Sequence, residues 1–251
     1  MENVRTNINW IDDLLPDGLQ IKTSTIITGP GGSGKPLIGE TFVSAWLQKG
    51  GSVAFMSLQY PSTDFISESI KKVTGLDLSL YNDHLLFFQL DTNIENIVDE
   101  GNKNIRANLV KPEVWESALE IAKSRLPKTG PGILLFTSAF NLLLFSPTYG
   151  KEILSKIKQI ILEDKSLTYI FSVSTTAKKE EIETLENIAD NLLISRSEKP
   201  PLKLFLKVER AKDVQFDNKE IQIPIKPETL QHLKKVAEHS RNKVIPEILK
   251  I

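Results

Sequence analysis

GPGGSGKP, at residues 29–36, is the stretch of sequence that decides the fold. It follows a run of β-branched residues, Thr25–Thr28, and it precedes an amphipathic segment that starts at Leu37. All but the last of its positions fit the pattern G-x-x-x-x-G-K-[ST], and the flanking segments have the strand and helix character that this pattern requires. We therefore expect a strand, a glycine-rich turn and a helix in direct succession.

Each part of this loop has a physical reason to favour a phosphate group. Glycines let successive backbone N–H groups point inward, the following helix contributes its positive end, and a lysine supplies a mobile charge. ATP or another phosphate-bearing ligand is thus the expected occupant. The residues expected to bind it are Gly29, Gly31, Gly32, Ser33, Gly34, Lys35 and Pro36.

The last position of the loop departs from the pattern. Pro36 stands where a Ser or Thr hydroxyl would bind Mg²⁺, and it lacks a backbone N–H as well. Proline is tolerated in the first turn of a helix, so the fold is expected to survive. The sequence therefore predicts that Mg²⁺ binding is weak or absent, and we assign no metal ligand.

Composition places the chain among ordinary globular proteins. Its 251 residues include 31 basic and 32 acidic ones, 40% are hydrophobic, and none is cysteine. Disulfides and thiolate chemistry are excluded, and no stretch approaches the roughly 18 apolar residues of a membrane helix. We expect a cytoplasmic protein without membrane contact, of a composition that leans toward a thermophilic source. A net charge of −1 gives no overall attraction for nucleic acid, so such binding would need a local patch.

Short apolar runs alternate with amphipathic segments along most of the chain. This order is typical of an α/β fold with a mostly parallel central sheet and helices on both faces. Further on, LKLFLKV and EIQIPI predict an antiparallel hairpin at one edge of the sheet. The expected strands are Thr25–Thr28, Ser52–Ser57, His84–Leu90, Gly132–Thr137, Thr168–Val173 and Asn191–Ser195, and the expected helices are Leu37–Gln48, Thr63–Val73, Glu113–Ser124, Gly150–Leu162 and Glu180–Ile188.

We divide the chain into a main domain, residues 1–225, and a C-terminal helical tail, residues 226–251. The tail helix opens with Pro227 and places Leu230, Leu233 and Val236 on one stripe. The tail holds six basic residues against three acidic ones. This excess indicates a solvated or partner-facing helix, with nucleic-acid contact as the alternative.

With NWIDDLLPDGLQIKTSTIITGPGGSGK, residues 9–35, in view, the chain resembles the RecA superfamily of P-loop ATPases, in its KaiC-like and archaeal RadA-paralog branch. The similarity continues through the strand Ile133–Thr137 and the hairpin of residues 202–225, so it covers about residues 1–225. The resemblance implies a RecA-like fold and an ATP site, and relatives form rings or filaments. Self-association or a protein partner is therefore expected.

The resemblance also shows what this chain has lost. The family places its general base in a pattern like S-L-E-E-P, where this chain has Ser57-Leu58-Gln59-Tyr60-Pro61. Gln59 cannot accept a proton, although it could orient a water. The Walker B strand of the family ends in Asp, where this chain has the neutral Thr137. Both Walker motifs are thus degenerate, and no catalytic residue is assigned beyond Gln59 at the general-base position.

Two cations on the expected hairpin resemble family residues that reach a nucleotide on a neighbouring subunit. Lys207 and Arg210 are the nearest equivalents, although their spacing differs by one and the family's glycine is missing. Strand-end cations in water are the alternative interpretation. Thr175 and Thr176 follow a strand where relatives often have a polar sensor, and ordinary capping residues at a strand end are the alternative interpretation.

Three hypotheses about function follow. In the first, the chain is a pseudo-ATPase that acts as a binding, assembly or regulatory module. In the second, it is a working or weakly working Mg-ATPase in which Gln59 positions the water. In the third, it is a DNA-associated recombinase paralog.

Overall fold

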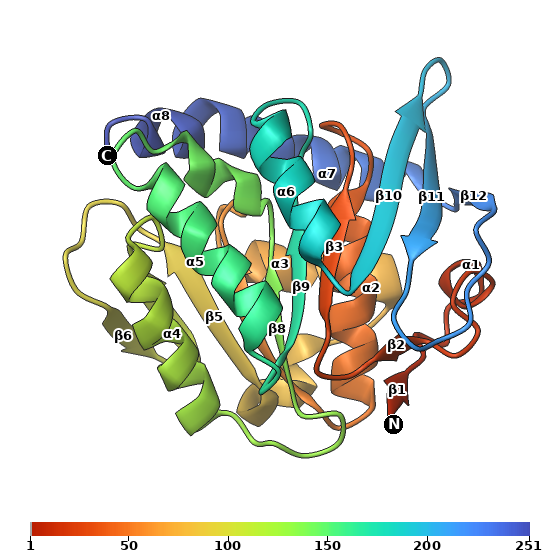
Figure 1. Cartoon of the computed structure of the whole chain (residues 1–251), viewed down its shortest axis with the longest axis horizontal. Helices are drawn as coiled ribbons and strands as arrows, with labels where there is room; N and C mark the ends of the chain where they lie inside the picture. The colour runs from red at the N-terminus through yellow and green to blue at the C-terminus, as the bar shows by residue number, and fades with distance from the viewer. Residues whose placement is uncertain (1) are drawn as a thin grey trace.

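The computed structural model describes residues 2–251 and shows a sheet of ten strands covered by helices on both faces (Figure 1). The strand order is β12-β11-β10-β3-β9-β8-β4-β5-β7-β6. In chain order these strands are β3 (Ser24–Thr28), β4 (Ser52–Ser57), β5 (Leu85–Leu90), β6 (Val98–Gly101), β7 (Asn104–Ala107), β8 (Ile133–Thr137), β9 (Thr168–Ser172), β10 (Asn191–Glu198), β11 (Lys203–Arg210) and β12 (Glu220–Ile223). The expected α/β fold class is confirmed.

The centre of the sheet is parallel from β10 through β3, β9, β8, β4 and β5 to β7. Its strands β3, β4, β8 and β9 are buried at every position, because helices cover both faces. The glycine-rich loop follows β3, and β9 separates β3 from β8. Loops that follow parallel strands meet at one edge of the sheet, so this carboxyl edge collects the glycine-rich loop, Gln59 and the end of β8.

Two hydrophobic clusters hold the layers together. The face covered by α4 (Pro112–Arg125), α5 (Gly150–Glu163) and α6 (Lys179–Ile188) buries Trp115 and Ile157. The face covered by α2 (Lys35–Gln48) and α3 (Thr63–Thr74) buries Phe42 and Ile70. In Figure 1 the first three helices lie in front of the sheet and the other two lie behind it.

The two edges of the sheet are antiparallel. At one edge β10 pairs with β11 and β11 pairs with β12, which confirms the expected hairpin. At the other edge β6 and β7 form a hairpin that the sequence analysis did not anticipate. The smaller elements that precede β3 or connect strands are β1 (Asn3–Val4), α1 (Asn9–Asp12), β2 (Leu19–Gln20), and the 3-10 helices η1 (Leu78–His84) and η2 (Phe140–Phe145).

The C-terminal segment packs along the main body. It consists of α7 (Pro227–His239), the π-helical turn η3 (Ser240–Val244) and α8 (Ile245–Ile248). Proline at position 246 lacks an N–H, and the π-helical turn ends two residues before it. In Figure 1 this segment runs from the side of α3 along the carboxyl edge to η2.

The buried side of α7 differs from the stripe expected from sequence. Val236 is buried as expected, but Leu230 and Leu233 are only half-buried, while Thr229 and His232 are buried. His232 stacks on Phe65 of α3 with ring centroids 3.8 Å apart, so the buried side of α7 includes this ring. Within residues 2–251 no helix is long and apolar enough to cross a bilayer.

Candidate functional site: a glycine-rich cradle at the carboxyl edge

The glycine-rich loop begins at the end of β3, where the backbone of β10 approaches so closely that only glycine fits. Gly29 has a φ of +144°, and a Cβ there would lie 2.0 Å from the carbonyl oxygen of Ser195 on β10. Gly34, at the start of α2, has a φ of +85°, and a Cβ there would lie 2.7 Å from a methyl group of Leu204 on β11. Strands β10 and β11 therefore fix the two ends of the loop.

Lys35 folds back into its own loop. Its Nζ donates to the carbonyl oxygens of Gly29 at 2.8 Å and Pro30 at 2.7 Å, and to Ser33 Oγ at 3.2 Å. Burial lowers the pKa of the Lys35 ammonium to about 7. The ammonium thus sits within the loop, where a phosphate group would be its natural counter-ion.

Hydroxyl groups line the loop on two sides. Ser33 Oγ lies 2.7 Å from Ser195 Oγ, and Ser195 in turn donates to the carbonyl of Thr28 at 3.0 Å. On the other side the backbone N–H of Gly31 donates to Thr176 Oγ1 at 2.9 Å. Thr176 follows β9, and this contact places the suggested sensor position beside the glycine-rich loop, residues 29–36, which we call the cradle.

The first turn of α2 offers its amide groups without a side-chain cap. Gly34 is the N-cap residue, and within residues 2–251 no side chain makes a capping hydrogen bond to the turn. Pro36 lies in this first turn, where its missing N–H costs no helical hydrogen bond. The open helix start favours an anion, and Pro36 supplies no hydroxyl to a metal ion.

The loop after β4 carries Gln59 and Tyr60, and their side chains point in different directions. Gln59 is half-exposed at the carboxyl edge, whereas Tyr60 is 6% exposed and turns into the core. The Tyr60 hydroxyl donates to Glu40 Oε1 of α2 at 2.6 Å, and Ser69 of α3 donates to both Glu40 oxygens, at 2.7 and 2.9 Å. Burial raises the pKa of Glu40 to about 7, against the effect of the hydrogen bonds from Tyr60 and Ser69.

Thr137 ends β8 and is fully buried. It pairs in register with Met56 and Phe171, which belong to the cluster under α4, α5 and α6. Side chains in register across a parallel sheet share a face, so Thr137 lies on the face opposite α2. Its hydroxyl has no hydrogen-bond partner among the described residues. No hydrogen bond joins Thr137 to Lys35 among the described residues, and the Walker B role of Thr137 stays a prediction.

Phe136 occupies the α2 side of the same strand end. It belongs to the cluster under α2, and a Cβ on Gly39 of α2 would lie 2.3 Å from its ring. Within residues 2–251 no group of three or more His, Asp or Glu side chains is arranged to hold a metal ion. Neither Phe136 nor Thr137 supplies a carboxylate at this strand end.

The two hairpin cations make contacts within the chain. Lys207 Nζ pairs with Glu209 Oε2 at 2.6 Å. Arg210 donates to the carbonyl oxygen of Ala189 at 2.9 and 3.2 Å and also to that of Glu186. Arg210 therefore binds the carbonyl groups at the end of α6, and a reach to a neighbouring subunit stays a prediction for both cations.

Ser195 and Glu40 are the site residues that sequence reasoning missed. Ser195 ends the apolar run NLLIS beside β3, and a small polar residue at that place was the available signal. The sequence alone, by contrast, indicates that Glu40 is an ordinary polar residue of an amphipathic helix. Only the fold shows that it is fully buried.

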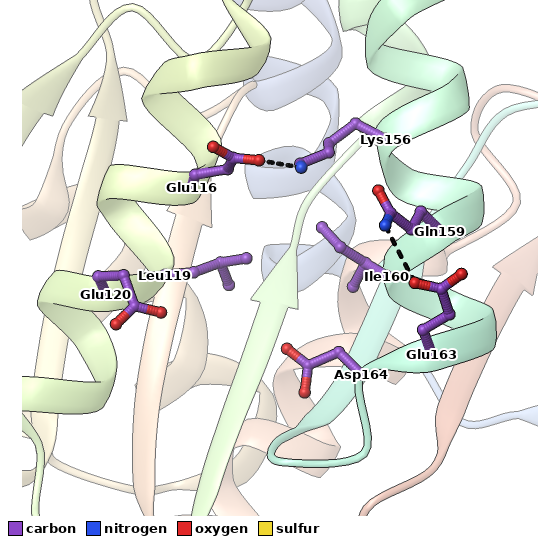
Figure 2. Close-up of a pocket in the computed structure, with 8 residues that line it drawn as sticks. All are labelled: Glu116, Leu119, Glu120, Lys156, Gln159, Ile160, Glu163 and Asp164. Carbon is purple, nitrogen blue, oxygen red and sulfur yellow. Dashed lines mark hydrogen bonds and ion pairs between the residues drawn. The ribbon is translucent and has the colours of Figure 1, made fainter.

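A separate groove of about 370 Å³ lies between α4 and α5, away from the cradle (Figure 2). Lys156 pairs with Glu116 across it. Burial alone would raise the pKa of Asp164, but hydrogen bonds from Ser166 and Tyr169 lower it to about 2, so this carboxylate is ionised. The excess of carboxylates repels phosphate. The lining residues are Glu116, Leu119, Glu120, Lys156, Gln159, Ile160, Glu163 and Asp164.

The strand order and the loop with its lysine define a P-loop ATPase of the RecA type. Residues 4–235 match the family model of the KaiC ATPase, and the chain therefore belongs to the KaiC-like branch of this superfamily. A search of curated proteins finds no match.

Two solved structures share this fold. The KaiC-like protein PH0186 of Pyrococcus horikoshii is 17% identical with a TM-score of 0.66, and the match covers 90% of this chain and 95% of that one. The flagellar accessory protein FlaH of Methanocaldococcus jannaschii is 14% identical with a TM-score of 0.63, over 90% of this chain and 96% of that one.

Proposed function

We propose that this KaiC family member binds the phosphates of a nucleotide in its cradle, hydrolyses them poorly or not at all, and serves as a binding, assembly or regulatory module. The observation that carries the proposal is the orientation of Tyr60. The residue that follows Gln59 points into the core toward Glu40, so neither residue presents a base at the carboxyl edge.

The cradle itself supports anion binding. The uncapped first turn of α2, the open space beside Gly32 and the ammonium of Lys35 fit a phosphate group. These groups would hold the nucleotide, while Ser33 and Thr176 would contribute hydroxyls beside it.

The same site has few oxygen ligands for a divalent ion. Mg²⁺ prefers oxygen ligands from carboxylates and hydroxyls, and it normally joins a P-loop hydroxyl to a carboxylate at a strand end. Here Pro36 has no hydroxyl, and Thr137 is neutral and lies on the opposite face of the sheet from α2. Nucleotide binding is therefore expected to gain little from Mg²⁺.

Titration calorimetry with ATP, with and without Mg²⁺, tests this function together with an assay of phosphate release. We expect equal affinity in both conditions, loss of binding in Lys35→Ala, and no turnover. Turnover that Mg²⁺ stimulates and Lys35→Ala abolishes would establish the weakly active ATPase instead. The combined variant Pro36→Thr, Gln59→Glu, Thr137→Asp is the positive control, because it restores the hydroxyl, the general base and the carboxylate of the family pattern together.

We also propose a cytoplasmic protein that works through a protein partner or self-association. The family membership supports this. The DNA-associated alternative predicts affinity for single strands that falls steeply with salt, and a flat response to salt would contradict it.

A further inference from the structure

Ser195 contacts the cradle from the neighbouring strand β10. Its side chain is fully buried, and its Oγ lies 2.7 Å from the Oγ of Ser33, the fifth residue of the cradle. A Cβ on Gly29, the first residue of the cradle, would lie 2.6 Å from the Ser195 Oγ. The backbone amides of the loop can bind an anion without this buried hydroxyl, so its contacts with the loop need another explanation.

One hydrogen bond of Ser195 sets the direction of the next. Ser195 donates to the carbonyl oxygen of Thr28 at 3.0 Å, because a carbonyl oxygen can only accept. A hydroxyl has a single hydrogen, so Ser33 is the donor between the two serines. The hydrogen of Ser33 also has the carbonyl oxygen of Pro30 within reach, at 2.8 Å. Ser195 therefore competes with Pro30 for the hydrogen of Ser33.

The ammonium of Lys35 depends on the same groups. It donates to the carbonyl oxygens of Gly29 at 2.8 Å and Pro30 at 2.7 Å, and to Ser33 Oγ at 3.2 Å. These three acceptors match the three N–H groups of an ammonium. A hydroxyl that donates a hydrogen bond is a stronger acceptor, so the bond from Ser33 to Ser195 strengthens the one from Lys35 to Ser33. It also leaves the Pro30 carbonyl to Lys35.

The edge of the sheet holds Ser195 in place. Successive side chains of a strand point to opposite faces, so Arg196 lies on the face away from the cradle. Its Nε donates to Glu220 of β12 at 2.5 Å, and its guanidinium lies 4.1 Å from the centre of the Phe205 ring on β11. The two edge strands thus fix the backbone beside Ser195.

We propose that Ser195 is a positioning residue of the cradle: it orients Ser33 as the third acceptor of the Lys35 ammonium, which is thereby retained inside the loop until a phosphate binds. Ser195 acts through Ser33, since its own hydrogen is given to Thr28. This inference deepens the proposed function and rests on it, because the phosphate is that of the nucleotide in the cradle.

This role has a signature in the pH dependence of phosphate binding. Ser195→Ala weakens the contact that holds the charged form of Lys35 in the ligand-free cradle, so the pKa of Lys35 should fall. In the complex the ammonium has left Ser33 for the phosphate, and the substitution costs nothing there. Affinity should thus rise where the ligand-free Lys35 is charged and stay unchanged where it is neutral. A residue that only supports the fold would lower affinity at every pH when removed.

Titration calorimetry with ATP at about pH 6 and about pH 8.5 tests this signature, because burial lowers the pKa of Lys35 to about 7. The substitution weakens one hydrogen bond and removes none from Lys35. We therefore expect about threefold tighter binding in Ser195→Ala at the lower pH, and equal affinities of variant and wild type at the higher pH.

The chain supplies a matched control on α2. Ser44 is also buried, and its Oγ lies 2.6 Å from Oγ1 of Thr74, which donates to the carbonyl oxygen of Ile70 at 2.9 Å. Ser44→Ala removes a hydroxyl from an equivalent chain of hydrogen bonds and should leave ATP affinity unchanged at both pH values. Weaker binding in Ser195→Ala at both pH values, or equal changes in the two variants, would overturn the proposal.

Nuclear magnetic resonance of the full chain without ligand gives an independent reading. The probe is the ε-¹³C signal of Lys35, assigned by its disappearance in Lys35→Ala and followed as the pH changes. We expect its midpoint to fall in Ser195→Ala by the logarithm of the gain in affinity, and to stay in place in Ser44→Ala. An unchanged midpoint in Ser195→Ala would overturn the proposal.

Two acids on the elements around the cradle are common to every variant. Glu40 of α2 accepts from Tyr60 at 2.6 Å and also from Ser69, and Glu186 of α6 accepts from Thr28 Oγ1 at 2.5 Å. Their titration contributes equally to all the curves. Differences between the variants therefore report on Lys35.

A double-variant cycle tests whether Ser195 acts through Ser33. In the background Ser33→Ala, the change Ser195→Ala should have no further effect on the Lys35 midpoint, and an undiminished effect would overturn the proposal. If Ser195→Ala does not fold, Ser195→Cys replaces it, because a thiol fills the same place and is only a weak acceptor. If the wild type binds no ATP, the proposed function fails, whereas the Lys35 signal still decides the positioning.

Discussion

Replacing Glu40 with Gln should change how the stability of the protein depends on pH. The ordinary pKa of this carboxyl is 4.5, and in the folded protein burial raises it to about 7. The folded state thus holds the proton more tightly than the unfolded state does. The contribution of this proton to the free energy of unfolding is fully present below pH 4.5 and is lost as the pH rises to 7.

The difference of about 2.5 pH units, at about 1.36 kcal/mol for each, corresponds to about 3 kcal/mol in the free energy of unfolding. Glutamine resembles the protonated acid in shape, and it can still accept from Tyr60. We therefore expect the wild type to lose about 3 kcal/mol relative to Glu40→Gln between pH 4.5 and 7.5. Urea unfolding at half-unit pH steps measures both curves.

Comparing wild type with Glu40→Gln removes the contribution of other titrating groups to the pH dependence of stability. Asp77, Asp164 and Asp190 have pKa values lowered to about 2, and they contribute equally to both proteins. Parallel curves for wild type and Glu40→Gln across this range would refute the reasoning, because they would mean that Glu40 is ionised in the fold as readily as in water.

Two further substitutions test packing and capping. Gly39→Ala places a Cβ 2.3 Å from the Phe136 ring and should cost about 1–3 kcal/mol in urea unfolding; a smaller residue at 136 should restore part of it, and unchanged stability would contradict the contact. Arg210→Ala leaves the carbonyl groups of Glu186 and Ala189 without this donor and should cost about 1–2 kcal/mol. Unchanged unfolding combined with weaker ATP binding would instead favour a role for Arg210 at a neighbouring nucleotide.

Much of the fold could be read from sequence because the central strands are continuous apolar runs. β4 has the expected bounds, Ser52–Ser57, since VAFM is bounded by small polar residues. The β6–β7 hairpin gave no such signal. Its sequence from Val98 to Ala107 is mostly polar, and only Ile105 and Ala107 are buried, as suits the outer edge of a sheet.

The candidate site likewise has one part that the sequence predicted and one part that it did not. Local spacing predicted the glycine-rich loop, because the strand, the loop and the helix are consecutive in the chain. The direction of Tyr60 could not be predicted, since it depends on Glu40, twenty residues before it, and on Ser69 of the next helix. The side of the sheet on which Thr137 lies likewise depends on the register with β4 and β9, which no local pattern specifies.

The folded-back position of Lys35 has a thermodynamic consequence for any phosphate that enters the loop. The incoming anion must draw the ammonium away from two carbonyls and Ser33, and it then favours the charged form of a side chain whose pKa is about 7 beforehand. Association above neutral pH therefore takes a proton from the buffer. The heat measured for it will vary with the ionisation enthalpy of that buffer, and the affinity will decline in alkaline solution.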